Sequence, residues 1–499
     1  MVFDLRKLQN GSDIRGIAIE GVSGEDVNLS ENAAGCIATS FAMWLGRKVN
    51  KNPFELKICV GYDSRLSGES LKISVLKGLH VMGAVGYDAG LSSTPAMFMA
   101  TVLPQFEFDG AIMITASHLP YNRNGFKFFT ADGGLDKADI VKILEDANKF
   151  NFIGEYYEIH PVNVMEMYAA YLRQLISFGI KEIPGGLSDM HIIVDAGNGA
   201  GGFFAEKVLK PLGADVSGSL YLEPDGRFPN HIPNPENADA LQEIRKAVVS
   251  NGADLGIIFD TDVDRSAAIG PDGRTFARNE IVALAAAIGA PSYPGGTVVT
   301  DSITSDELHE FLEKDLGLKH LRYKRGYKNV INKAKDLQEE GIQAFLAIET
   351  SGHAAFSDNY FLDDGAFLAV QIVVEAAKMK SEGKTIGDLI SGLKTPAEAK
   401  EIRLDIKADD FDAIGNKIIE DLLKWANKKE GLSPCEENFE GARISFDIDG
   451  FKGWFLLRKS LHDPVMPLNI ESSKEGGIKR ILPVISEFIQ NYPELSGLC

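Results

Sequence analysis

The segment Thr115–Lys127 contains the residues of this chain whose types and spacing most clearly suggest chemistry. It follows the apolar run Ala111–Ile114, which predicts a buried strand. Ser117 and His118 therefore stand where a strand gives way to a loop, and a proline, an Asn-Gly pair that we expect to form a turn, and Lys127 follow. A hydroxyl beside an imidazole and an ammonium group can serve as a nucleophile or a phosphate carrier. Ser-His pairs are also common in ordinary polar loops, so this segment needs a second motif beside it.

The second motif is a row of carboxylates that follows the apolar strand Leu255–Phe259. Asp260, Asp262 and Asp264 occupy alternate positions, which in an extended or gently curved segment point the same way. Three converging carboxylates repel one another, so a divalent cation is the natural partner, and an all-oxygen shell favours Mg²⁺ over Zn²⁺. The next residue, Arg265, can pair with a carboxylate or with phosphate. The alternative for this segment is a solvated acidic turn.

A different enzyme class competes for the same carboxylates. With a one-residue slip, the string approaches the Asp-x-Asp-x-Val motif of haloacid-dehalogenase-type phosphatases and mutases, in which the first Asp takes the phosphoryl group. That interpretation makes Asp260 the nucleophile and leaves Ser117 without a role. In that superfamily the motif usually opens its domain, whereas here it closes one.

The elements that must position these motifs alternate between strands and helices. In the first α/β unit, strands are predicted at Leu56–Gly61, Asp109–Thr115 and Phe126–Phe129, between helices at Glu69–Met82, Pro95–Leu103 and Lys137–Phe150. Two further α/β units follow, and in the first of them a strand at Met190–Asp195 precedes a helix over Gly202–Leu212. Such alternation predicts mixed or parallel sheets covered by helices, one architecture used three times. Past Leu393 the pattern changes to a smaller α+β unit.

We therefore predict three similar α/β domains and a smaller C-terminal α+β domain. The predicted boundaries are residues 1–160, 161–275, 276–396 and 397–499. The segment with Ser117 would lie in the first domain and the segment with the three aspartates in the second. A chain of 499 residues is too long for a single core, which agrees with several domains.

Composition and charge narrow the class of partner. The chain is 44% hydrophobic and 24% charged, as in ordinary globular proteins, and its formal net charge is −20. Nucleic acid and anionic membranes repel such a charge, so neither is an expected partner. The four cysteines lack metal-ligand spacing and are expected as reduced thiols: Cys36, Cys59, Cys435 and Cys499. With no membrane-spanning run and no signal or transit composition at Met1–Gly16, we expect a cytoplasmic protein, a mature organellar form being the alternative.

Taken in order along the chain, the motifs resemble those of the α-D-phosphohexomutase superfamily, the phosphoglucomutase/phosphomannomutase enzymes. The resemblance spans nearly the whole chain. It rests on Ser12–Gly16, Val60–Arg65, Thr115–Lys127, Asp260–Arg265, Gly326–Lys328 and Glu349–His353, the last being similar to the family's sugar-binding Glu-x-Ser-Gly-His loop.

The resemblance implies a phosphoserine mechanism around a central cleft. Ser117 would carry a phosphoryl group whose oxygen completes the Mg²⁺ shell of the three aspartates, with His118 beside it. Lys127 and Arg15 would serve as proton-transfer and positioning groups. A hexose phosphate would pass through a bound hexose 1,6-bisphosphate that turns over between two transfers. Substrate-binding roles would fall to the remaining matched residues: Arg265, Lys328, Glu349, Ser351, His353, Arg458, Ser460 and His462.

The chain departs from the family at its phosphate-binding loop. Where the family has Arg-x-Ser-Gly-Thr-Glu-Pro, this chain has Arg458-Lys459-Ser460-Leu461-His462-Asp463-Pro464. Losing the glycine removes a position that brings backbone N–H groups close to phosphate. His462 can replace a hydroxyl donor, and Lys459 adds charge. A smaller departure is Leu119, where the family has Asn.

The expected activity is interconversion of hexose 1-phosphate and hexose 6-phosphate, with glucose or mannose as the sugar, by a monomer or weak homodimer. An amino-sugar phosphate, as in phosphoglucosamine mutases, is the near alternative, because the Glu-x-Ser-Gly-His loop is shared across subfamilies. The phosphatase centred on Asp260 is a second alternative. A catalytically silent sugar-phosphate sensor, suggested by the altered loop, is a third.

Overall fold

The computed structural model of the chain describes residues 4–151, 154, 156–408, 410–460 and 464–498. Their contacts divide the chain into two compact units. The first unit comprises Met1–Ile288 and Ser351–Leu389, and the second comprises Gly289–Thr350 and Ile390–Cys499. The four domain ranges predicted from the sequence stay a prediction beside this division.

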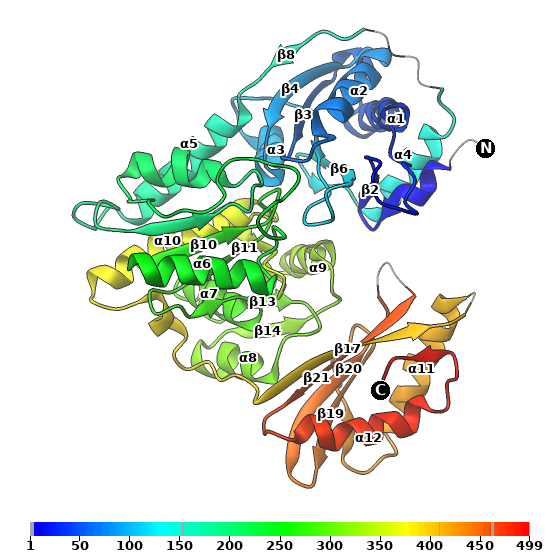
Figure 1. Cartoon of the computed structure of the whole chain (residues 1–499), viewed down its shortest axis with the longest axis vertical. Coiled ribbons are helices and arrows are strands. Elements are labelled where there is room, and N and C mark those ends of the chain that lie inside the picture. The colour runs from blue at the N-terminus through cyan, green and yellow to red at the C-terminus, as the bar shows by residue number, and fades with distance from the viewer. Residues whose placement is uncertain (1–3, 152–153, 155, 409, 461–463, 499) are drawn as a thin grey trace. The chain divides into compact units, whose positions relative to one another are not determined.

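The N-terminal part of the first unit is a mixed sheet with helices packed on it (Figure 1). From edge to edge its strands are β1 (Gln9–Asn10), β2 (Asp13–Ile17), β6 (Arg123–Thr130), β5 (Gly110–Ile114), β3 (Lys57–Tyr62), β4 (Val85–Leu91) and β8 (His160–Pro161), with β7 (Gly133–Gly134) beside β6. Strands β3, β4 and β5 are parallel, whereas β6 runs antiparallel to both neighbours. The helices are α1 (Glu31–Val49), α2 (Gly68–Val81), α3 (Thr94–Val102) and α4 (Lys137–Ala147).

The Asn-Gly pair after the serine loop is not the turn that we predicted. Asn124 and Gly125 lie within β6, where Gly125 is paired with Arg15 of β2. A Cβ atom at Gly125 would lie 2.0 Å from the carbonyl oxygen of Ile14, so the glycine is required by the close approach of two backbones. The reversal of the chain takes place earlier, between β5 and β6.

The rest of the first unit contains a second mixed sheet. Its strands follow the order β12 (Thr275–Phe276), β11 (Ser266–Ile269), β10 (Leu255–Phe259) and β9 (Ile192–Asp195). Beside them the chain forms α5 (Val164–Gly179), α6 (Ala238–Asn251), α7 (Asn279–Gly289), β16 (Ala354–Phe356) and α10 (Gly365–Ser381). Helices α6 and α10 both contact β10, which is buried along its whole length.

The helix predicted over Gly202–Leu212 is present, but its hydrogen-bond pattern is irregular. A π-helical segment covers Phe204–Leu209, and a 3₁₀ turn covers Lys210–Leu212. Pro211 lies in the 3₁₀ turn, and because proline has no backbone N–H it cannot continue the preceding hydrogen-bond ladder.

The second unit begins with parallel strands and ends with an antiparallel sheet. The parallel strands are β14 (Lys319–Arg322), β13 (Thr297–Thr300) and β15 (Ala344–Ile348), accompanied by α8 (Asp306–Glu310) and α9 (Tyr327–Glu339). The antiparallel sheet has the order β18 (Leu432–Pro434), β19 (Ala442–Ile448), β20 (Phe451–Leu457), β21 (Val465–Ser472), β17 (Glu398–Ile406) and β22 (Leu495–Ser496), with α11 (Phe411–Ala426) and α12 (Gly477–Ile489). The predicted fold class, mixed α/β sheets followed by a smaller sheet-rich part, is confirmed.

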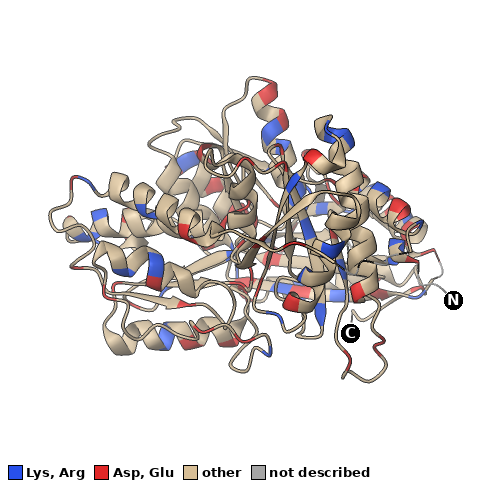
Figure 2. Cartoon of the chain, turned by 90° about the horizontal axis from the view of Figure 1, so that it is seen from above, with Lys and Arg blue, Asp and Glu red and all other residues tan. Residues whose placement is uncertain are grey.

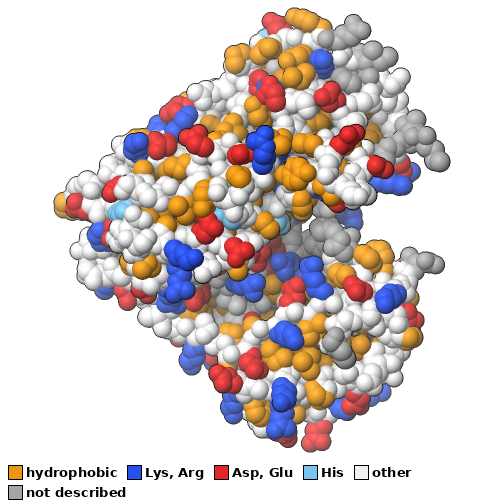
Figure 3. Space-filling view, viewed as in Figure 1, with side chains coloured by type: hydrophobic (Ala, Val, Ile, Leu, Met, Phe, Trp, Pro, Cys, Tyr) orange, Lys and Arg blue, Asp and Glu red, His pale blue; other side chains and the backbone are white. Residues whose placement is uncertain are grey.

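Charged residues are distributed over the helices and loops rather than gathered in one block (Figure 2). On the face drawn in Figure 3, basic side chains are interspersed with acidic ones. Among the helices that the structure describes, none is both long and apolar enough to cross a membrane.

Candidate active site

The serine loop, residues 115–122 between β5 and β6, is held by hydrogen bonds from a buried arginine. The Arg65 guanidinium donates hydrogen bonds to the carbonyl oxygens of Ser117 and Leu119, and also to those of Pro120 and Arg123. Its side chain is completely buried. Ser117 itself adopts a left-handed backbone conformation with φ of 50°, and its N–H donates to Thr115 Oγ1 at 2.9 Å. Arg65 thus fixes a strained turn that presents the serine side chain.

The metal loop, expected to be extended or gently curved, is the tighter connection of a β-hairpin. Strands β10 and β11 pair antiparallel, with Phe259 opposite Ser266, so the residues between them form a turn. Within it Val263 has φ of 68°, which is rare for a β-branched residue. The three carboxylates nevertheless converge, because the turn gathers Asp260, Asp262 and Asp264 with oxygen atoms within 4.8 Å of one another.

Neighbouring backbone holds this hairpin turn in place. The N–H groups of Ala200 and Gly365 donate to the carbonyl oxygens of Thr261 and Val263, at 2.8 and 3.1 Å. A Cβ atom at Gly365 would lie 2.5 Å from the carbonyl carbon of Arg265, which explains the glycine at the start of α10.

The serine loop and the metal loop meet at Ser117. Its Oγ donates to Asp260 Oδ2 at 3.0 Å and accepts from Arg265 Nη2 at 2.8 Å. Arg265 also donates to Asp260 through its backbone N–H, Nε and Nη2, at 3.2, 3.1 and 2.9 Å. The hydroxyl group therefore lies between one carboxylate and one guanidinium, both buried.

Lys127 contributes a second cation to the cluster. Its ammonium group forms a close ion pair with Asp264 and lies 3.5 Å from Asp262 Oδ2. Burial raises the pKa of Asp264, but Lys127, His353 and Arg265 outweigh it and hold the pKa below its usual range. Burial and the neighbouring Asp264 raise the pKa of Asp260 well above its usual range. Burial thus disfavours the charged form of Asp260, whereas the neighbouring cations keep Asp264 ionised.

Two oxygen atoms of the cluster make this site suitable for a metal ion. Asp262 Oδ1 and Asp264 Oδ1 are buried and have no hydrogen-bond partner among the described residues. Buried carboxylate oxygens without donors are costly, and a hard divalent cation is the ligand that such a set of oxygens accepts. Thr94, at the start of α3, donates its hydroxyl to Asp262 Oδ2 and orients that carboxylate.

His118 lies beside the serine as a hydrogen-bond acceptor. Its Nδ1 is 3.3 Å from Ser117 Oγ and 2.5 Å from Arg265 Nη2. The charge of Arg265 and burial lower the pKa of His118 to about 2, so the ring is neutral and Nδ1 accepts from the guanidinium. Arg15 lies on the other side of the turn, where it donates to the carbonyl oxygen of Thr115 and pairs with Asp13 at 2.7 Å.

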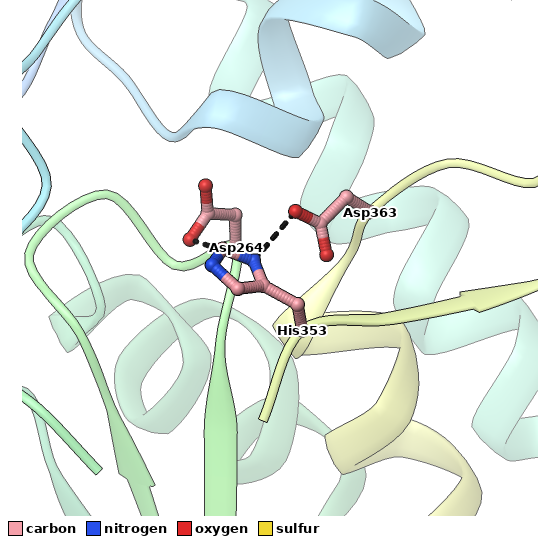
Figure 4. Close-up of side chains that lie close together, drawn as sticks. All are labelled: Asp264, His353 and Asp363. Carbon is pink, nitrogen blue, oxygen red and sulfur yellow. Dashed lines mark hydrogen bonds and ion pairs between the residues drawn. The ribbon is translucent and has the colours of Figure 1, made fainter. Parts of the chain in front are cut away.

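His353 joins the cluster from the segment after β15, and its ring lies between the carboxylates of Asp264 and Asp363 (Figure 4). Its Nδ1 is 2.6 Å from Asp363 Oδ2 and 3.7 Å from Asp264 Oδ1. Burial lowers the pKa of His353, but the two carboxylates prevail and raise it to about 9. The imidazole is therefore a cation at neutral pH, which accounts for this acidic pair without a metal ion there.

The second unit contains the other predicted binding residues. Glu349 Oε1 accepts from the N–H of Gly326 at 2.5 Å, and Gly326 lies two residues before Lys328 of α9. Arg458 is buried, its Nε has no hydrogen-bond partner among the described residues, and its Nη1 donates to the carbonyl oxygen of Lys459 at 3.3 Å. The backbone N–H of Ser460 donates to Val465 at 2.9 Å. His462 lies outside the described residues, and Ser351 is buried in the first unit.

Several side chains of the site were not predicted from the sequence. Arg65 belongs to the motif Val60–Arg65, to which we assigned no role. Thr94 and Asp363 look like the polar residues that commonly precede or begin a helix, here α3 and α10. In the second unit, Asp301 accepts from Thr350 Oγ1 at 2.8 Å, and burial and Glu349 raise its pKa to about 7. Only their contacts in the folded protein distinguish these residues from ordinary polar ones.

Comparison with known proteins places this geometry in a family. Models for the phosphoglucomutase/phosphomannomutase family match three stretches: α/β/α domain I at residues 6–152, domain II at 166–273 and domain III at 277–395. Among the structures with a similar fold is a phosphoglucomutase/phosphomannomutase family protein from Burkholderia thailandensis. It has a TM-score of 0.78 and 25% sequence identity, and the match covers 98% of each chain.

Relatives from bacteria and archaea align over nearly the full length. A phosphoglucomutase/phosphomannomutase of Thermococcus kodakarensis is 32% identical over 487 residues, 95% of this chain and 97% of the relative. A phosphomannomutase/phosphoglucomutase of Pseudomonas syringae pv. tomato is 29% identical over 447 residues, 88% and 89% of the two chains. A phosphomannomutase of Escherichia coli is 30% identical over 473 residues, 91% and 93%. The chain therefore belongs to the phosphoglucomutase/phosphomannomutase family, within the α-D-phosphohexomutase superfamily.

Proposed function

We propose that this protein is a mutase that interconverts the 1-phosphate and the 6-phosphate of glucose or mannose. The observation that carries the proposal is the buried Ser117 hydroxyl, hydrogen-bonded to Asp260 and Arg265 next to a carboxylate cluster. The names of the relatives, which pair glucose with mannose, support both sugars as substrates. Family membership argues against the Asp260 phosphatase, which gave Ser117 no role.

The proposed reaction transfers one phosphoryl group twice. The bond between phosphorus and Ser117 Oγ breaks as a bond to the free hydroxyl oxygen of the hexose phosphate forms, which yields a bound 1,6-bisphosphate. As Ser117 Oγ leaves, the Lys127 ammonium group gives it a proton, and the resulting amine takes the proton of the sugar hydroxyl. After the bisphosphate has turned over, its other phosphoryl group returns to Ser117; the Lys127 ammonium group then protonates the sugar oxygen that is released, and the amine takes the proton of the Ser117 hydroxyl.

The surrounding residues orient the serine for this transfer. Arg265 Nη2 holds Ser117 Oγ, and neutral His118 accepts from the same guanidinium. Arg65 and Arg15 bind the carbonyl oxygens of the serine loop and keep its turn rigid. Burial of the site limits access of water, which would otherwise hydrolyse the phosphoserine.

We assign Mg²⁺ to Asp260, Asp262 and Asp264, together with an oxygen of the group on Ser117. When bound, the ion offsets the negative charge that develops on the transferring phosphoryl group. We assign sugar and second-phosphate recognition to the remaining predicted residues: Lys328, Glu349, Ser351, His353, Arg458, Ser460 and His462. We also propose that the enzyme is cytoplasmic and that it is a monomer or a weak homodimer.

The test is a coupled assay for glucose 6-phosphate from glucose 1-phosphate, with Mg²⁺ and a trace of the 1,6-bisphosphate, combined with intact mass of the purified protein. Wild type should turn over and carry one phosphate, and Ser117→Ala should lose both properties. Ser250→Ala, which removes an exposed serine of α6, is the matched control. Wild type without turnover, or full turnover in Ser117→Ala, would refute the proposal.

The same assay separates the alternatives. A silent sensor binds hexose phosphate without turnover and lacks phosphate on Ser117. A phosphatase centred on Asp260 releases inorganic phosphate steadily, loses activity in Asp260→Asn and keeps it in Ser117→Ala. A panel of glucose, mannose and glucosamine 1-phosphates distinguishes the neutral hexoses from an amino sugar.

A further inference from the structure

The loop Leu222–Asn237, which precedes α6 and contains four prolines, has no role in the reaction just described. Here it is called the proline loop. It is fixed to the end of β9, where His231 Nε2 lies 3.0 Å from Asp195 Oδ2 and both side chains are buried. Asn230 Nδ2 also donates to Asn198 Oδ1 at 2.8 Å. The proline loop is therefore a rigid attachment rather than a free connection.

One part of the proline loop lies against the arginine that holds the serine loop. The Phe228 ring faces the Arg65 guanidinium at 5.2 Å, within the range of a cation–π interaction. At Gly226 an added Cβ atom would lie 2.4 Å from the carbonyl oxygen of Ser64, so the two backbones approach closely. The proline loop is thus placed by contacts with the serine side of the site.

Another part reaches the arginine that contacts the serine directly. Asn234 Oδ1 accepts from Arg265 Nη1 at 3.3 Å and from the N–H of Glu236 at 3.0 Å. The second bond closes a turn of the proline loop on the same oxygen. The position of this oxygen is therefore set by the loop backbone.

We infer that Asn234 is a positioning residue for phosphoryl transfer, which fixes the plane of the Arg265 guanidinium so that Nη2 faces Ser117 Oγ. This inference rests on the proposed function, because it concerns the group carried by Ser117. A planar guanidinium is held firmly when more than one edge is bound. Asp260 binds Nε and Nη2, and Asn234 binds the remaining nitrogen, Nη1.

Without Asn234, the guanidinium can rotate about the edge that Asp260 holds, and Nη2 leaves its direction toward Ser117. A misplaced group at a reacting centre lowers the rate of the chemical step more than it lowers ground-state binding. The effect should therefore fall on kcat and on the lifetime of the phosphoserine, and leave KM for the hexose phosphate near its wild-type value.

The experiment compares Asn234→Ala, Asn234→Asp and wild type by steady-state kinetics with glucose 1-phosphate, and by intact mass of Ser117 during incubation without substrate. Asn234→Ala should lower kcat roughly tenfold, the scale of one hydrogen bond to a charged group. Asn234→Asp keeps an acceptor oxygen and should recover most of the loss. Asn251→Ala, which removes an exposed asparagine at the end of α6, should match wild type.

Each outcome decides the inference. Wild-type kcat and phosphoserine lifetime in Asn234→Ala would overturn it, as would a change confined to KM or an equal loss in Asn234→Asp. If Asn234→Ala does not fold, Asn234→Ser keeps the turn to Glu236 but is too short to reach Arg265, and the same expectations apply to it. Wild type without turnover would instead count against the proposed function, whatever the variants do.

Discussion

Burial has different effects on the ionisation of different side chains in this protein. Asp264 and His353 stay ionised because opposite charges surround them, which lowers the pKa of Asp264 and raises that of His353. At Glu471 on β21 burial favours the neutral form. Burial and the neighbouring Glu307 raise the pKa of Glu471 to about 7, although Arg443 partly opposes them. Its Oε2 accepts from Trp454 Nε1 at 2.9 Å, a bond that a protonated side chain also allows.

The pKa of Glu471 predicts a pH dependence of stability in the second unit. Between pH 4.5 and about 7 the folded state binds more protons at this carboxyl than the unfolded state, so its contribution to stability falls as the pH rises through this window. Glu471→Gln should remove that loss and raise the free energy of unfolding at pH 8 by about 1–3 kcal/mol. Urea denaturation at pH 5 and pH 8 measures the difference. The exposed Glu475→Gln should show no such change, and a Glu471→Gln effect independent of pH would contradict the assignment.

From the sequence we predicted which carboxylates converge, but not the backbone conformation that brings them together. Asp260, Asp262 and Asp264 were expected to share a face of an extended or gently curved segment, whereas a hairpin turn with Val263 in a left-handed conformation gathers them. Arg65 and Asn234 could not have been assigned, because their partners are backbone carbonyls and side chains far away in the chain. A periodic pattern predicts burial, but it carries no information on such contacts.

Among the secondary structure elements, β6 can pack closely against β2 because Gly125 has no side chain. Gly125 lets β2 approach so closely that Arg15 and the serine loop share one edge of the sheet. Strand β5 was predictable because it is a continuous apolar run, buried along its length. Strand β4 was missed although the apolar residues of Val85–Leu91 alternate as in a strand, because the two glycines and Asp88 between them are typical of turns.

Gly125→Ala should therefore damage both stability and activity. The added methyl group would meet the Ile14 carbonyl oxygen at 2.0 Å and the Thr115 carbonyl oxygen at 2.9 Å. Overpacking of this kind costs about 1–3 kcal/mol of unfolding free energy and should displace Arg15 from the serine loop. Gly134→Ala on the adjacent β7 is the matched control, since its nearest atom would be 3.5 Å away. Urea denaturation and the coupled assay measure both effects, and equal behaviour of the two variants would show that β2 can move aside.

At the scale of the whole molecule, the division into two units places the carboxylate cluster in one of them. The three tryptophans are distributed so that each unit can be followed alone: Trp44 lies in the first unit, and Trp425 and Trp454 lie in the second. The division itself was not predictable from the sequence. Strand and helix patterns specify local elements, whereas the units depend on which elements share contacts.

Metal binding should consequently stabilise one unit more than the other. At a hundredfold excess over Kd, Mg²⁺ should stabilise the first unit by about 2–3 kcal/mol and so raise its unfolding temperature. Tryptophan fluorescence during heating, with and without EDTA, measures this in two variants. The Trp425→Phe/Trp454→Phe protein reports the first unit and should respond, whereas Trp44→Phe reports the second and should respond little. Equal shifts in both would contradict a site confined to the first unit.

The left-handed backbone of Ser117, with φ of 50°, has a consequence for how this protein can change. Such a conformation costs a residue with a Cβ atom about 1–2 kcal/mol, and only glycine avoids it. Ser117→Gly and Ser117→Ala both lack the hydroxyl, so we expect the glycine variant to unfold at a higher urea concentration, by about 1 kcal/mol. Equal midpoints would show that the turn is unstrained. Val263, with φ of 68°, poses the same conflict in the metal loop. A laboratory selection for stability alone would thus favour changes in these two loops that silence the enzyme, so activity has to be selected together with stability.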